Sequence, residues 1–194
     1  MTEAAMTDQV RFINGIDADT LSKTVDAIRD DPELGVSRFR VRNRWLAGNH
    51  NRSTVTGFYA ARQEIAHKQS FDMDADEPAI LAGNDEGANP VEHLLHALAS
   101  CVTTSMVAHA AVRGIPINSL ESEVEGDIDL NGYLGLSSDV PRGYTDLRVR
   151  FKVDADPKYH NRLRELSKFS PVFNTIVNGA NVDIRVDPKA AMGE

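Results

Sequence analysis

Strict alternation of polar and apolar side chains marks three segments of this 194-residue chain as β-strands. Residues 38–46 (RFRVRNRWL) place arginines on one face and Phe39, Val41 and Trp45 on the other. Residues 120–130 carry acids on one face, and residues 146–153 carry basic residues opposite apolar ones. Residues 54–73 continue the strand pattern with weaker alternation, and residues 181–186 (NVDIRV) have the pattern of a closing strand. Each of these strands is expected to bury one face.

The charges on the three alternating strands are complementary. The acidic face of residues 120–130 matches the basic face of residues 146–153 and the arginine face of residues 38–46, which consists of Arg38, Arg40, Arg42 and Arg44. Four arginines on one face could bind an anionic ligand. We favour the alternative, a cross-strand charge ladder on the outside of a sheet, because exposed ion pairs need no dedicated site.

Capping residues mark the helices. A short helix is expected from the N-cap Asp19 to the stop at Asp30-Asp31-Pro32, and a long one from Asn89-Pro90 to Arg113-Gly114. Two short helices follow, one after Pro157 and one from Ser170-Pro171 to Gly179. This order of elements predicts an α+β fold: strands come first, then a helix, further strands, further helices and a last strand.

The chain is predicted to divide into an arm and one domain, and the domain contains an acidic loop. Residues 1–36 are predicted to form a polar, partly helical arm, and residues 37–190 a single domain. Residues 72–90 form an acidic stretch with Pro78, Gly83 and Gly87. We interpret it as a solvated loop and not a metal site, because its acids lack the ligand spacing of a calcium loop.

Composition narrows the class of protein. Hydrophobic residues make up 41% and charged residues 26%, as in a globular domain. A net charge of -8 argues against nucleic-acid binding. One cysteine excludes an internal disulfide and a CxxC pair, and fits a reducing compartment. The acidic N-terminus lacks the apolar region of a signal peptide, so a cytoplasmic protein is expected.

The central helix is the most informative segment, because Ala97 to Val112 contains no charged residue. A helix that is apolar all round must be covered all round, so we expect a homodimer that buries it. A membrane span is disfavoured because polar residues such as Ser100, Thr104 and His109 interrupt the run. Cys101 lies on this helix, and His109 lies about 12 Å further along the axis, too far for a direct dyad. No metal and no cofactor site is predicted.

The run NPVEHLLHALASCV, followed by RGI, a pair of strands and a Ser-Pro-Val helix start, resembles the OsmC/Ohr family of osmotically inducible and organic hydroperoxide resistance proteins. The resemblance covers about residues 38–187, most of the chain. It implies an α+β fold in which two antiparallel sheets wrap around central helices in an intertwined homodimer. It also implies thiol-dependent reduction of organic hydroperoxides.

The resemblance implies roles for three residues. Cys101 matches the thiol that a hydroperoxide oxidises to a sulfenic acid. Glu92 matches a glutamate that orients an arginine, which lowers the pKa of that thiol. Ser170 stands where the family has a second cysteine, which resolves the sulfenic acid into a disulfide.

The chain departs from the family pattern in two ways. Ser170 replaces the resolving cysteine, so an external thiol would have to reduce the enzyme. No cation lies in residues 76–90, before the helix, and the sequence does not select among Arg44, Arg52 and Arg62 as a substitute. Two functions therefore stay open: a slow one-cysteine hydroperoxide reductase, or a non-enzymatic dimer that binds a small apolar ligand.

Overall fold

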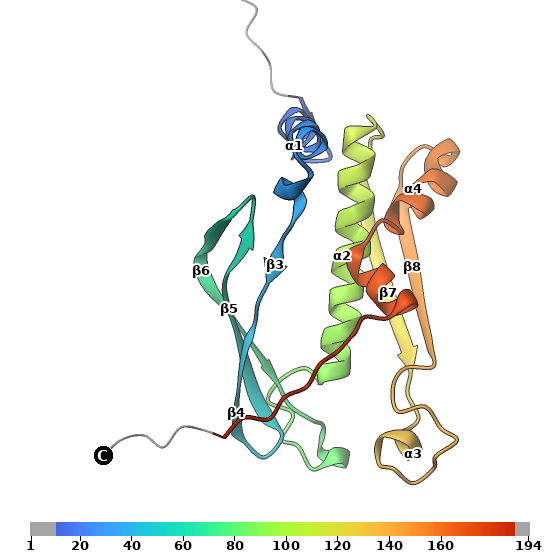
Figure 1. The fold of residues 1–194 in the computed structure, drawn as a ribbon. Coiled ribbons are helices and arrows are strands. Elements are labelled where there is room, and N and C mark those ends of the chain that lie inside the picture. The colour runs from blue at the N-terminus through green and yellow to red at the C-terminus, as the bar shows by residue number, and fades with distance from the viewer. Residues whose placement is uncertain (1–10, 189–194) are drawn as a thin grey trace, which may run out of the picture.

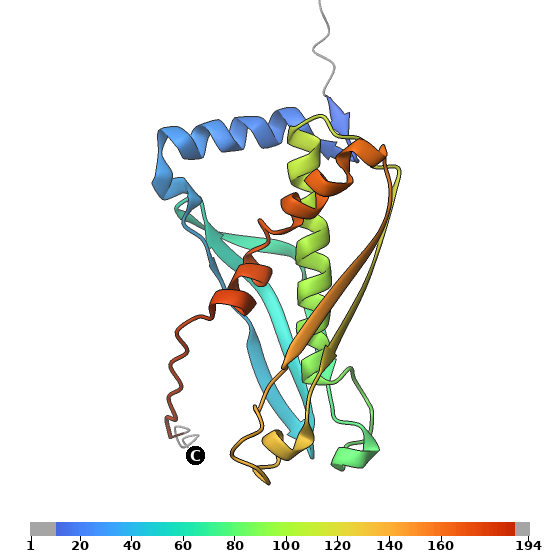
Figure 2. The same ribbon diagram turned by 90° about the vertical axis from the view of Figure 1, so that its right-hand side faces the viewer.

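A long central helix, α2 (Pro90–Val112), organises the computed structural model, which describes residues 11–188. A four-stranded antiparallel sheet lies on one side of α2, and a two-stranded sheet with the C-terminal helices lies on the other (Figures 1 and 2). The predicted α+β class is confirmed. A small β1–β2 hairpin near the N-terminus is a third sheet that the sequence did not indicate.

The described part of the N-terminal arm contains two short strands, a helix and a turn. These are β1 (Phe12–Ile13), β2 (Ile16–Asp17), α1 (Ala18–Asp30) and the 3-10 turn η1 (Pro32–Gly35). The N-cap of α1 is Asp17, which accepts from two backbone N–H groups, and not Asp19 as predicted. Asn14 joins the arm to the domain, since its side chain donates to the carbonyl of Ile115 and accepts from the backbone N–H of Ile117.

The larger sheet consists of β3 (Arg38–Phe39), β4 (Arg42–Ala47), β5 (His50–Ala60) and β6 (Gln63–Ala75). The middle strand β5 pairs with β3 and β4 on one side and with β6 on the other. The predicted single strand over 38–46 is interrupted at Arg40–Val41. Residues 54–73 form a hairpin, not one strand, because Ala61 and Arg62 take the positive φ angles of a tight turn. The acidic loop begins at Asp76, since β6 includes residues 72–75.

The second sheet consists of β7 (Ser119–Asp127) and β8 (Asp146–Asp154). Their predicted ladder is confirmed: Arg148 contacts Glu125 and Asp127, and Lys152 contacts Glu123 at 2.7 Å. The hydrogen bond from Lys152 lowers the pKa of the Glu123 carboxyl. The arginine strand does not join this ladder, because β4 pairs with β5. Strand β7 also ends at Asp127, short of the predicted residue 130, and the helix α3 (Leu130–Tyr133) follows.

The C-terminal helices follow their predicted caps. They are the 3-10 turn η3 (Pro157–Tyr159), α4 (His160–Ser167) and α5 (Pro171–Asn178), which ends at Gly179 with φ 73°. The predicted closing strand over residues 181–186 is wrong for the single chain, because this segment is extended but pairs with no described strand. Its apolar side chains are among the most exposed, with Ile184 at 83% and Val186 at 94%.

The core lies around the C-terminal half of α2. Met106 and Ala110 pack there with residues of α4 and the loop after α2, which are Ile115, Leu163 and Leu166. The N-terminal half is less covered, and Val91 and Leu94 are 37% and 40% exposed. By length and composition alone α2 could cross a membrane, but a core helix meets the same test. Its contacts with α4, β7 and α5 are those of a core helix.

Candidate functional site: a thiol on the central helix

Local capping fixes where α2 begins and therefore where Cys101 lies. The Asn89 side chain accepts from the backbone N–H of Val91, and the Glu92 carboxylate accepts from the backbone N–H of Asn89 at 2.9 Å. Together they form a capping box with Pro90 in the first turn. The OH of Tyr144 donates to the carbonyl of Val91, and burial together with the negative charge of Glu92 raises the pKa of Tyr144.

Cys101 lies in the middle of α2 as a free, partly buried thiol. One turn later, Ser105 is buried on the same side of the helix. The exposed side of this region carries Ser100 and Thr104, whose hydroxyls donate to backbone carbonyls of the preceding turn. Cys101 thus lies between the buried side of α2, which carries Ser105, and the exposed side, which carries Ser100 and Thr104.

Glu92 is separated from the thiol within one chain. Nine residues place it about 14 Å from Cys101 along the axis and on the opposite side of the helix. No arginine among residues 11–188 forms an ion pair with Glu92, whose carboxylate serves as a cap. Its role in orienting an arginine stays a prediction.

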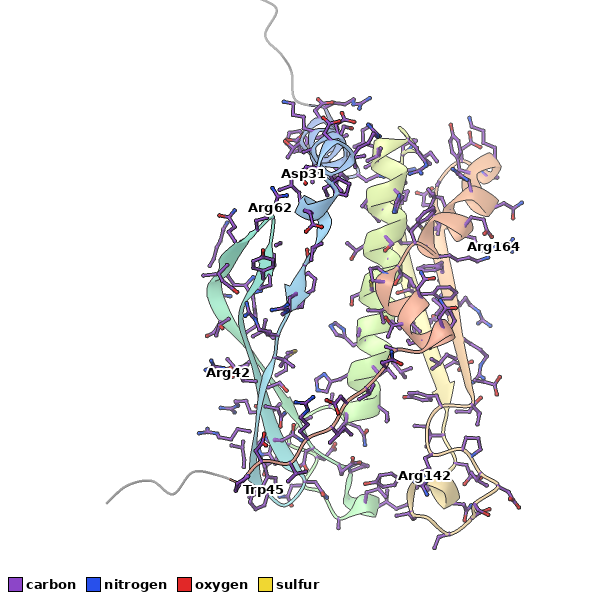
Figure 3. All side chains as sticks on the ribbon, viewed as in Figure 1. Asp31, Arg42, Trp45, Arg62, Arg142 and Arg164 are labelled. Carbon is purple, nitrogen blue, oxygen red and sulfur yellow. The ribbon has the colours of Figure 1, made fainter. Side chains whose placement is uncertain are left out.

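The three arginines considered as activators have other surroundings. Arg52 donates two hydrogen bonds to the Asp74 carboxylate, of 2.7 and 2.9 Å. This contact lowers the pKa of the Asp74 carboxyl. Arg62, at the tip of the β5–β6 hairpin, forms an ion pair with Asp31 of the arm at 2.8 Å (Figure 3). Arg44 lies directly opposite Arg52 in the sheet. Two of the three are thus bound by carboxylates of their own chain.

Ser170 is completely buried at the start of α5. Its hydroxyl accepts from the backbone N–H of Phe173 at 3.0 Å, as expected of an N-cap. The neighbouring Phe169 packs against His109 with the two rings tilted and their centroids 4.4 Å apart, which brings the start of α5 beside α2. Burial and the nearby positive charge of Arg113 lower the pKa of His109. The proximity of Ser170 to the sulfur of Cys101 stays a prediction.

Sequence reasoning missed a polar cluster beside the start of α2. His50 has one ring nitrogen 3.4 Å from Asp74 and the other 3.0 Å from Glu86. Asp76 is buried and accepts from three backbone N–H groups of the loop. Asp74, Asp76 and Glu86 belong to the acidic stretch 72–90, which the sequence marks but whose pattern we interpreted as a solvated loop. The burial of Asp76 corrects that interpretation, and no motif indicated that the distant His50 would join these acids. The side chains of this cluster are not arranged to hold a metal ion. No other group of three or more His, Cys, Asp or Glu side chains within residues 11–188 is so arranged either.

The comparisons with known proteins decide the family. The sequence model described as OsmC-like protein matches residues 83–185, which is more than half of the chain and includes all three candidate residues. The chain belongs to the OsmC-like family. No curated protein sequence matches it significantly.

Solved structures agree with the OsmC-like fold. An OsmC-like protein from Mycoplasma pneumoniae superposes with a TM-score of 0.54 at 19% identity, covering 73% of this chain and 89% of the other. A protein from Psychrobacter arcticus, named for osmotic stress induction and a detoxification response, gives 0.53 at 17% identity, covering 70% and 85%. An OsmC-like protein of unknown function from Vibrio cholerae gives 0.51 at 12% identity, covering 72% and 94%. At these identities the likeness shows the fold alone.

Proposed function

We propose that this OsmC-like protein reduces organic hydroperoxides through Cys101, as a slow one-cysteine enzyme of oxidative stress defence in the cytoplasm. The observation that carries the proposal is a free, partly buried thiol in the middle of the central helix, inside the region that matches the family. The apolar surface around it suits the organic part of a hydroperoxide. No cofactor takes part.

The reaction balances with an external thiol as the reductant. The Cys101 thiolate attacks one oxygen of the O–O bond, an S–O bond forms, and the O–O bond breaks. The alkoxide takes up a proton and leaves as an alcohol, while the sulfur becomes a sulfenic acid. An external thiol then attacks that sulfur and releases water, and a second thiol frees Cys101 as the reductant becomes a disulfide.

The reaction is expected to be slow. Only the thiolate attacks, and a cation beside a thiol normally increases the thiolate fraction. In this chain Arg52 and Arg62 pair with Asp74 and Asp31, and no arginine is recorded in contact with Cys101, so no activating cation is assigned within residues 11–188. The same observation favours the second candidate function, a non-enzymatic dimer that binds a small apolar molecule.

Consumption of cumene hydroperoxide in the presence of dithiothreitol tests the first function. We expect slow consumption above the protein-free rate, complete loss of it in Cys101→Ala, and no loss in the matched control Ser105→Ala. Fast consumption that depends on Cys101 would show that an activating cation is present after all. A wild-type rate equal to that of Cys101→Ala would reject the enzyme and leave the binding function.

We also propose that the protein is a homodimer in which α2 packs against its counterpart. Only 28% of the most apolar stretch of α2 is buried within one chain. The hydroxyls of Ser100 and Thr104 donate to backbone carbonyls of the same helix. This surface can therefore be buried without leaving either hydroxyl without a hydrogen-bond acceptor. Large apolar side chains elsewhere also lack cover, among them Phe39 at 74% exposed and Trp45 at 70%. Such area is typical of an interface.

Sedimentation at micromolar concentration tests the assembly. We expect a dimer for the wild type and a shift to monomer for Thr104→Glu, because a carboxylate on the buried helix surface would lose its hydration. Ser138→Glu, in an exposed loop, adds the same charge and should stay dimeric. A monomeric wild type would contradict the proposal.

A further inference from the structure

The arginine face of β3 and β4 remains unexplained by the thiol site. The acidic face of β7, which could have neutralised these arginines, pairs with the basic face of β8 instead. On the larger sheet the acids of β6 are used by β5, since Arg52 holds Asp74 and the Thr54 hydroxyl donates to Asp72 at 2.6 Å. Arg42 has no carboxylate within ion-pair distance among the described residues. The Arg42 guanidinium is exposed and unpaired among the described residues, so it is available to an anionic ligand.

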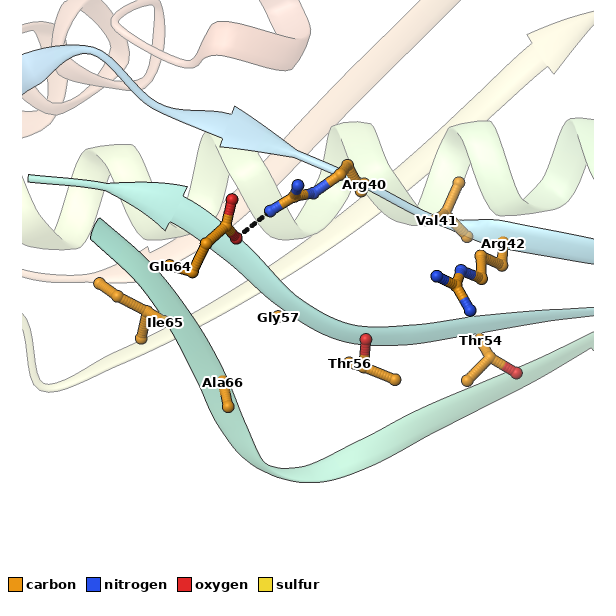
Figure 4. Close-up of a pocket in the computed structure, with 9 residues that line it drawn as sticks. All are labelled: Arg40, Val41, Arg42, Thr54, Thr56, Gly57, Glu64, Ile65 and Ala66. Atoms are coloured by element: carbon orange, nitrogen blue, oxygen red, sulfur yellow. Dashed lines mark hydrogen bonds and ion pairs between the residues drawn. The ribbon is translucent and has the colours of Figure 1, made fainter. Parts of the chain in front are cut away.

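Arg42 lines a groove of about 400 Å³ on the face of the sheet that points away from α2 (Figures 3 and 4). The groove lies where β3 gives way to β4 and where the register of β5 against β6 shifts between Val55 and Gly57. Thr56 therefore has no cross-strand partner on β6, and it is exposed where it lines the groove. A register irregularity of this kind bends the strand locally, and the groove lies at that bend.

Hydrogen-bond donors reach this groove from more than one side. Arg42 extends over Thr54 on one wall, and Arg40, which bonds Glu64, forms the other (Figure 4). Thr56 lies between them. A planar carboxylate is satisfied by one guanidinium, whereas donors arranged around a hollow suit an ion whose oxygens point in several directions. Val41 and Ile65 add apolar lining, and the space exceeds that of a bare oxyanion.

We propose that this groove binds the phosphate group of a small phosphate monoester, with Arg42 as the main contact and Thr56 as a second donor. The site lies on the opposite face of the sheet from α2, so it is separate from Cys101. Glu64 balances the charge of Arg40, which leaves Arg42 as the dominant positive group. Binding is expected to weaken as salt concentration rises, because all of these groups are near the surface.

Titrations followed by the backbone amide signals of Thr56 and Gly57 test the site on the full chain. Inorganic phosphate and sulfate should shift these signals saturably, phenyl phosphate should bind more tightly than phosphate, and acetate should bind least. Arg42→Gln should weaken phosphate binding by about tenfold or more, and Thr56→Val by a smaller factor. Arg44→Gln is the matched control: it removes the same charge from the same face but does not line the groove, and should bind nearly as the wild type does.

Three results would overturn the proposal. Signals that do not respond to phosphate or phenyl phosphate would show that the groove is empty or that a second copy of the chain occupies it. Equal weakening by Arg42→Gln and Arg44→Gln would show a diffuse charge effect. Acetate binding as tight as phosphate would assign the groove to carboxylates. None of these outcomes depends on hydroperoxide reduction.

Discussion

Ser170→Cys, exposed to one equivalent of an organic hydroperoxide, is expected to lose both thiols together and to form a disulfide with Cys101 in the same chain. The wild type should stop at a sulfenic acid or stay unreacted. Serine and cysteine are nearly isosteric, so the buried cap at the start of α5 can hold the sulfur. A thiol at a helix N-terminus also has a lowered pKa, which favours attack on a sulfenic acid.

Non-reducing peptide mapping with thiol titration measures this result. The disulfide requires the two Cα atoms to lie within about 7 Å or to move there. Ser167→Cys is the matched control, because Ser167 is also buried, lies three residues earlier, and should stay a free thiol. If the oxidised Ser170→Cys protein keeps both thiols, or links them only between chains, either the placement of Ser170 or the reactivity of Cys101 is wrong.

Asp76→Ala is expected to be the most destabilising substitution in the loop before α2. Asp76 is 1% exposed, and its carboxylate accepts from the backbone N–H groups of Glu77, Asn84 and Glu86 at 2.8, 3.0 and 3.2 Å. Alanine would leave these donors without their acceptor. We expect the melting temperature to fall by about 5 °C or more. Asn84→Ala, in the same loop but exposed, should change it little.

The same carboxylate predicts an acid sensitivity. Burial acts to raise the pKa of Asp76, but the three backbone N–H donors and the nearby His50 outweigh it and lower the pKa below 3.8. A group whose pKa is lowered by folding stabilises the protein above its unfolded pKa and loses that contribution as the pH falls through the folded value. Stability should therefore decline below about pH 3.8, and less steeply in Asp76→Ala. Equal acid profiles for the two proteins would contradict the assignment.

The proposed site was predictable in part from sequence. The helix that carries Cys101 could be delimited because Asn89, Pro90 and Gly114 act on neighbouring residues only. The motif around it led to the OsmC-like family, which residues 83–185 confirm. The partners of the arginines could not be predicted, because Arg62 meets Asp31 only after the hairpin tip folds against the arm.

Sequence by itself determined the elements whose signals are local. Alternation placed β7 and β8, and their opposite charges predicted the ladder that forms between them. Tertiary structure decided which strands are neighbours: β4 pairs with β5, so the arginine face lies beside Thr54 and Arg52 instead of the acids of β7. The alternation of polar and apolar residues shows which face of a strand is buried, but it does not show which strand will be its hydrogen-bonded neighbour. Residues 181–186 therefore have the pattern of a strand and stay unpaired in the single chain, since strand hydrogen bonds require an edge that only folding or assembly supplies.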